Sequence, residues 1–255
     1  TIWALTVGAV GAGAKSETSF GGALSVAGAG SVNIVDNTIE SYIDTSTVIS
    51  GSNKDISITA KDSTLIMANA GLLGVAVGLG TKAIAASLGG SVAINTVTGD
   101  IRSYINDSTI TSAGGLNLAA ESNTTIWAMT LAGVGAGSKG SSSYGLALSG
   151  AGAGSVNVIS RSIESYIKGD GTLVKTIATG NGMGVVLNSK DNSLILASAG
   201  VLSAAVGVGE TSGVGGSMGA SVIVNVVNNT TDSHISGAKV VSAKEVDLDA
   251  ESNAT

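Results

Sequence analysis

The chain repeats itself, and this repetition limits its possible folds more than any other feature. Residues 1–43 and 125–167 align without a gap, and 27 of the 43 aligned positions are identical. The opening segment TIWALTVGAVGAGAK returns as TIWAMTLAGVGAGSK at 125–139. A cleavable export signal does not recur 124 residues later in the same chain, so the opening segment is interpreted as part of the repeated fold.

Each of these two long repeats contains two shorter repeats. A short motif occurs four times, each time followed by SYI or SHI: SVNI at 31–34, SVAI at 91–94, SVNV at 155–158 and SVIV at 221–224. The repeats cover approximately 1–60, 61–124, 125–189 and 190–250, and we expect them to form a single repetitive segment. The last residues begin a fifth copy, which predicts that the chain is a fragment of a longer protein.

The apolar residues alternate with a period of two, as in Ile56 and Ile58 or in Leu116 and Leu118. This period is typical of β-strands, and the chain contains no proline that would interrupt interior strands. A repeat of about 62 residues divides into about three coils of ~20 residues each. We therefore expect an all-β parallel β-helix, or β-solenoid, with about three coils per repeat. A sandwich of antiparallel strands is the alternative architecture.

Composition excludes several classes of function. The net charge of −6, without clusters of Lys and Arg, argues against nucleic acid as a partner. The absence of cysteine excludes disulfides, thiolate metal sites and cysteine nucleophiles. The longest uncharged apolar stretches, 65–80 and 194–209, are shorter than the ~20 residues that a spanning helix needs. We therefore expect no membrane insertion of this segment.

Several residue types recur at equivalent repeat positions, which predicts structural roles for them. Stacked asparagines at strand ends are expected to form a ladder that satisfies buried turn groups. The single histidine occupies the position held by tyrosine in the other repeats, which favours packing over catalysis, and the two tryptophans also occupy equivalent positions. These structural positions are Asn33, Asn95, Asn157 and Asn225; Tyr42, Tyr104, Tyr166 and His234; and Trp3 and Trp127.

Alternating glycine and alanine, as in GAGAGS at 150–155, predicts a face where two sheets approach closely. The sequence leaves open whether this face packs within one rod or against a neighbouring one.

The sequence predicts no catalytic, cofactor or metal site. Carboxylates are dispersed along the chain, and aromatic residues, which sugar-cleaving enzymes place beside their carboxylates, make up only 3% of it. The segment GAGSKG at 135–140 matches GxGxxG, but no helix-forming segment follows it, so a dinucleotide site is not expected.

The pattern SVxxN, SYI, a Ser/Thr-rich turn and xxLxAxSxxxI resembles repeats in the passenger regions of large bacterial surface proteins. These include filamentous-haemagglutinin-like adhesins, autotransporters and leukotoxin-type exoproteins. The resemblance covers essentially the whole chain and implies a right-handed parallel β-helix. It also implies export through the outer membrane and an extracellular or cell-surface location.

The leading hypothesis is a structural repeat segment of an extracellular adhesin or surface fibre. Its expected partners are a host or neighbouring-cell surface or matrix, bound through many weak contacts. The turns at 15–20 and 139–144 are candidate contact surfaces, with Lys15, Phe20, Lys139 and Tyr144 as the residues of interest. One alternative is self-association into filaments or matrix through lateral Gly/Ala faces, and a lesser one is a polysaccharide-active β-helix enzyme.

Overall fold

The computed structural model describes residues 1–177 and 183–255, and the chain is all-β over these ranges. Eighteen strands, all within the described residues, form four sheets in which every paired strand is parallel to its neighbour. The parallel β-solenoid is therefore confirmed, and the antiparallel sandwich is wrong. No helix that could cross a membrane is found in the part of the chain that the structure describes.

The sheets are named A to D in the order in which the chain first enters them. Sheet A contains β1 (Ile2–Lys15), β6 (Leu65–Gly80), β10 (Thr125–Gly140) and β14 (Leu194–Gly209). Sheet B contains β2 (Phe20–Asp36), β3 (Ile39–Asp44), β7 (Lys82–Asn106), β11 (Tyr144–Lys168), β15 (Ser212–Val227) and β16 (Thr230–Ser236). Sheet C contains β4 (Thr47–Ile49), β8 (Thr109–Ser112), β12 (Leu173–Thr176) and β17 (Lys239–Ser242), and sheet D contains β5 (Ile56–Asp62), β9 (Leu116–Ser122), β13 (Val185–Asp191) and β18 (Val246–Ser252).

Each repeat forms one coil, so the prediction of about three coils per repeat is wrong. Ile2 pairs with Ile66, and Gly21 pairs with Ala83, so a strand lies beside its own equivalent one repeat later. The error came from treating glycine as punctuation between short strands. In the structure the Gly-rich segments continue as strands, because pairing on both sides holds them extended. GAGAGS, for example, lies inside the 25-residue strand β11.

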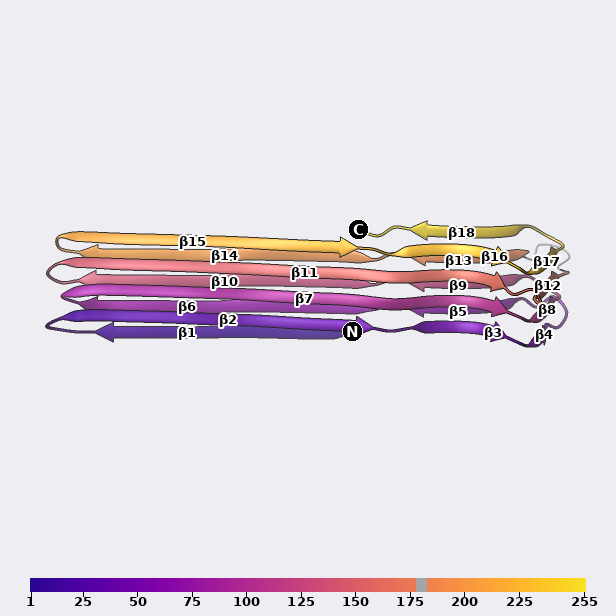
Figure 1. The fold of residues 1–255 in the computed structure, drawn as a ribbon, viewed down its shortest axis with the longest axis horizontal. Coiled ribbons are helices and arrows are strands. Elements are labelled where there is room, and N and C mark those ends of the chain that lie inside the picture. Colours follow the sequence, from indigo (N-terminus) through magenta and orange to yellow (C-terminus); the bar gives the residue numbers. More distant parts are fainter. Residues whose placement is uncertain (178–182) are drawn as a thin grey trace.

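The coil is a long, flat loop (Figure 1). From sheet A the chain makes a tight turn and returns through sheet B, crosses over in sheet C, and runs back through sheet D into the next strand of sheet A. Sheets A and D together cover the inner face of sheet B, since their buried side chains share hydrophobic clusters with it. At a strand spacing of ~4.8 Å, the four coils stack over roughly 19 Å.

The interior becomes thinner toward the tight turn. Near sheet C the core contains large side chains such as Ile105, Leu118 and Ile167, whereas near the turn it contains alanines such as Ala85 and Ala147. At Gly145 the two layers are so close that an added Cβ would overlap the backbone carbonyl of Val208. The predicted close approach of sheets therefore occurs within one stack, between a strand of sheet B and the sheet A strand of the next coil.

The GAGAGS segment divides its residues between the two faces of sheet B. Ala153 packs inside the coil with Leu72 and Val134, while Gly150, Gly152 and Gly154 alternate with the inward residues and face outward. The alanines thus pack within the coil, and the glycines form part of its outer surface.

Candidate functional site

The four asparagines form one continuous ladder through the stack. Asn33 Nδ2 donates to Asn95 Oδ1 at 2.8 Å, Asn95 Nδ2 to Asn157 Oδ1 at 2.7 Å, and Asn157 Nδ2 to Asn225 Oδ1 at 2.9 Å. Their pairing register is direct, so the structure aligns the asparagines even where the SV motifs are shifted by two residues. The predicted ladder is confirmed, but its position is corrected. The asparagines lie within strands, face inward, and bond mainly to each other instead of capping turns.

The tyrosines and the histidine form a second ladder, on the outer face of sheet B. Ring centroids are 5.0 Å apart for Tyr42 and Tyr104, 4.9 Å for Tyr104 and Tyr166, and 5.3 Å for Tyr166 and His234. The interplanar angles of 9°, 5° and 10° show nearly parallel stacking. Each inner ring has both faces covered by its neighbours, so the ladder presents ring edges and hydroxyl groups to solvent. This geometry supports the packing interpretation of the His234 position and leaves no open ring face on Tyr104 or Tyr166 for stacking a sugar.

Charged side chains accompany this ladder. Arg102 on β7 contacts Glu40 on β3 at 3.3 Å, Glu164 on β11 at 3.3 Å and Asp100 on its own strand at 2.8 Å. The arginine therefore links three successive coils through exposed and half-buried carboxylates. Sequence analysis did not predict this network, because Glu40 and Glu164 each lie 62 residues from Arg102 and only the coil register brings them together.

Burial raises the pKa of both inner tyrosines above 10.0, the ordinary value. Glu40, Tyr42 and Asp44 raise the pKa of Tyr104 further, and Arg102 lowers it. Tyr104, Glu164 and Glu40 raise the pKa of Tyr166 further, and Arg102 again lowers it. The unfolded chain ionises first on raising the pH, so the stability from these neutral phenols is complete below pH 10 and is lost above it.

We expect alkaline titration of tyrosinate absorbance to show two phenols in the folded protein that ionise above the ordinary value. Tyr104→Phe and Tyr166→Phe should each remove one of these late transitions, while the chain unfolded in guanidinium titrates near 10 throughout. Superimposable curves for the folded and unfolded protein would contradict this prediction.

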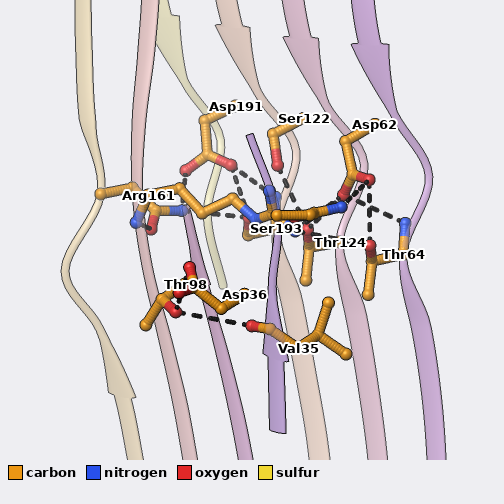
Figure 2. Close-up of polar contacts among 12 residues, drawn as sticks. Val35, Asp36, Asp62, Thr64, Thr98, Ser122, Thr124, Arg161, Asp191 and Ser193 are labelled. Carbon is orange, nitrogen blue, oxygen red and sulfur yellow. Dashed lines mark hydrogen bonds and ion pairs between the residues drawn. The ribbon is translucent and has the colours of Figure 1, made fainter. Parts of the chain in front are cut away.

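A buried polar cluster lies inside the coil, where sheet A follows sheet D (Figure 2). The side chain of Arg161 on β11 is fully buried, and its Nη2 atom lies 3.0 Å from Asp62 Oδ2 and 3.4 Å from Thr64 Oγ1. Thr124 Oγ1 also donates to Asp62 Oδ2, at 3.2 Å. The arginine thus extends from the third coil past the second to reach a carboxylate at the end of the first.

A second buried carboxylate completes the cluster (Figure 2). Asp191 accepts hydrogen bonds from Ser193 Oγ at 2.6 Å and from Asn229 Nδ2 at 2.7 Å. Burial lowers the pKa of Arg161, and the negative charges of Asp62, Asp191 and Asp36 oppose that shift. Arg161 Nε and Nη1 have no hydrogen-bond partner among the described residues. The cluster therefore neutralises charge inside the stack and gives no access to a substrate.

The two buried carboxylates occur in alternate coils. The first and third coils have Asp62 and Asp191 at a position where the second coil has Ser122 and the fourth Ser252. This alternation was visible in the sequence, as was the arginine at 161 in the segment that also contains Glu164 and Lys168, but sequence analysis did not connect them.

The remaining predicted residues lie on the outer surface. Trp3 and Trp127 both pair with Met67 on the outer face of sheet A, and they are 74% and 53% exposed. They are equivalent repeat positions, as predicted, but they lie outside the core. Phe20 and Tyr144 occupy equivalent positions after the tight turn and are also exposed.

The tight turns form one edge of the stack. A hollow of ≈ 310 Å³ lies among them, lined by Lys15, Ser16, Glu17, Leu79, Gly80, Lys139 and Ser141. The structure thus brings Lys15 and Lys139, from turns two coils apart, to the same hollow. Phe20 and Tyr144 do not line it.

We compared the chain with protein-family models, with curated proteins and with solved structures. None of them matches. Among the described residues, no group of three or more His, Cys, Asp or Glu side chains could hold a metal ion.

Proposed function

We propose that this chain is a structural segment of an extracellular bacterial adhesin or surface fibre, in which stacked coils display repeated contacts. The observation that carries the proposal is the in-register stacking of equivalent residues across four coils. Each coil offers the next the same asparagine, the same aromatic position and the same strand pairing. A stack built in this way can be extended by adding coils, which is the property of solenoid proteins that form long surfaces.

The edge of turns supplies a repeated surface for contact with a host cell, a neighbouring cell or a matrix. A turn returns with every coil at the strand spacing of ~4.8 Å, and the exposed lysines Lys15 and Lys139 return with every second coil. Weak contacts repeated at this spacing combine through effective concentration, so avidity grows faster than the number of coils. The resemblance to repeats of bacterial surface proteins supports the same location and role.

The proposal is tested with beads that carry either this chain or two copies of it in tandem, at equal surface density. Retention of the beads on cultured cells or on extracellular matrix is measured under shear flow. We expect the tandem protein to increase the retained fraction more than twofold over the single chain. Retention equal to that of beads coated with albumin, for both proteins, would overturn the adhesive role.

A matched pair of variants locates the contact. Replacing Lys15 and Lys139 by serine alters the edge of turns, whereas replacing Lys61 and Lys190 by serine removes the same charge from the outer face of sheet D. Reduced retention is expected for the first pair only. An equal reduction by both pairs would show that net charge, and not the edge of turns, determines adhesion.

A further inference from the structure

We propose that the outer face of sheet B is an interface at which two copies of this chain pack face to face. The "sheet-B face" consists of six successive outward positions on each of four strands. Its residues are Gly22, Leu24, Val26, Gly28, Gly30 and Val32; Ile84, Ala86, Leu88, Gly90, Val92 and Ile94; Leu146, Leu148, Gly150, Gly152, Gly154 and Val156; and Val214, Gly216, Met218, Ala220, Val222 and Val224. This inference goes beyond the adhesive role and does not depend on it.

At these positions sheet B directs apolar side chains to solvent and polar side chains into the coil, the reverse of the usual arrangement. Every residue of the sheet-B face is apolar or glycine, whereas Ser25, Asn33 and Ser87 on the same strands point into the coil. Leu24 is 65% exposed and Met218 77% exposed, although a sheet with one face in water normally directs its polar residues outward. A contiguous apolar face of this size marks an interaction surface.

The area of the face matches what a stable dimer needs. Six outward positions on a strand extend over roughly 40 Å, and four coils over roughly 19 Å, so the flat face measures roughly 750 Å². A standard protein–protein interface buries about 800 Å² on each partner. One second copy can therefore cover the whole face, and the flatness of the sheet suits an equally flat partner.

The relief of the face supports pairing with itself. The small residues Gly28, Gly90, Gly152 and Ala220 are direct register partners and form a stripe across all four coils. An apolar hollow of ≈ 510 Å³ lies beside this stripe, lined by Ala86, Leu88, Leu148, Ser149, Gly150, Gly216, Ser217 and Met218. We place the two-fold axis of the dimer along this stripe, so that the strands of the two copies run antiparallel across the interface. The backbones of the two copies then approach most closely at the stripe. The hollow of each copy faces the larger side chains on the far side of the other copy's stripe.

Charges at the two ends of the face favour this antiparallel arrangement. Lys82 faces outward at the turn end, and Asp36 faces outward where β2 ends. They lie four outward positions from the stripe, on opposite sides of it and one coil apart. A two-fold axis along the stripe places the lysine of each copy near the aspartate of the other, while a parallel arrangement would place like charges near each other.

The outer face of sheet A is less suited to this contact. Asn69 and Ser198 interrupt it with polar side chains, and Lys15 and Lys139 lie at its turn end. This difference provides a matched control, because Leu148 on the sheet-B face and Leu131 on sheet A belong to the same coil and are both 48% exposed.

Sedimentation equilibrium of the 24.6 kDa chain tests the proposal. We expect the wild-type protein to show twice its monomer mass, with a dissociation constant at or below about 10 μM. Leu148→Asp places two aspartates in the interface of each dimer and is expected to weaken association at least 100-fold. Leu131→Asp should leave the dimer unchanged. Circular dichroism and thermal unfolding establish that both variants fold, and Val156→Lys serves as a second variant of the sheet-B face.

Three outcomes would overturn the proposal. The first is a wild-type protein that stays monomeric at 100 μM, including one that instead co-sediments with phosphatidylcholine vesicles, which would assign the face to lipid. The second is association that is lost with Leu131→Asp and kept with Leu148→Asp. The third is association that neither variant changes, which would indicate contact between the open edges of the stacks.

Discussion

Replacing Arg161 by leucine should lower the free energy of unfolding by about 3–5 kcal/mol, because it leaves buried carboxylates without their cation. Asp62 lies 3.0 Å from the guanidinium, and Asp191 acts on it electrostatically inside the same cluster. Equilibrium unfolding in urea, followed by circular dichroism, measures the loss.

Two comparisons make this prediction specific. Arg102→Leu removes an arginine that contacts three carboxylates, against one for Arg161, but is 27% exposed, so its cost should stay near 1 kcal/mol. Combining Arg161→Leu with Asp62→Asn and Asp191→Asn removes the whole set of buried charges and should recover much of the loss. An Arg161→Leu protein that is as stable as the Arg102→Leu protein would contradict the electrostatic role of the cluster.

Gly99→Ala is expected to destabilise the protein by about 2 kcal/mol or more. Gly99 has a φ of +118°, a conformation that residues with a Cβ rarely adopt, and an added Cβ would overlap the carbonyl of Asn37. The backbone between β2 and β3 must therefore move away from β7. Hydrogen exchange should report this directly, because the Asn37 amide bonds to the Thr98 carbonyl at 3.3 Å and its protection should fall.

Gly137→Ala provides the matched control for this substitution. Gly137 faces outward on β10, its φ is not positive, and an added Cβ would meet nothing within 4 Å. Alanine there should be neutral or stabilise the protein by less than ~1 kcal/mol, because it restricts the unfolded chain. Equal losses of stability at the two positions would show that close approach to Asn37 is not what Gly99 provides.

The fold class could be predicted from the sequence because the repeat and the alternation of apolar residues agree. The number of coils per repeat could not be predicted, because glycine has two structural roles that composition does not separate. At Gly99, inside β7, it allows a positive φ that other residues rarely adopt, whereas in GAGAGS it continues a strand with ordinary φ. Only the register, with Asn33 beside Asn95, shows that one repeat makes one full coil.

The candidate sites were also predictable only in part. The asparagine ladder and the equivalence of His234 with three tyrosines were predictable, because each depends on a position that recurs once per repeat. Arg161 reaches Asp62 across 99 residues of sequence and occupies a position held by Gly99 in the neighbouring coil. The inverted polarity of sheet B was also hidden, because alternation shows which residues share a face but not which face lies inside.

The flat shape of the coil has a mechanical consequence. Its strands reach 25 residues, or roughly 80 Å, while its two layers are separated by about 10 Å. Such a stack has the cross-section of a ribbon, so its resistance to bending depends strongly on direction. Bending within the plane of the sheets must stretch or compress the hydrogen bonds between coils, whereas bending out of that plane deforms them little. An extended stack of these coils would therefore flex out of the plane of its sheets, and a pull along its axis would load all the inter-coil hydrogen bonds at once.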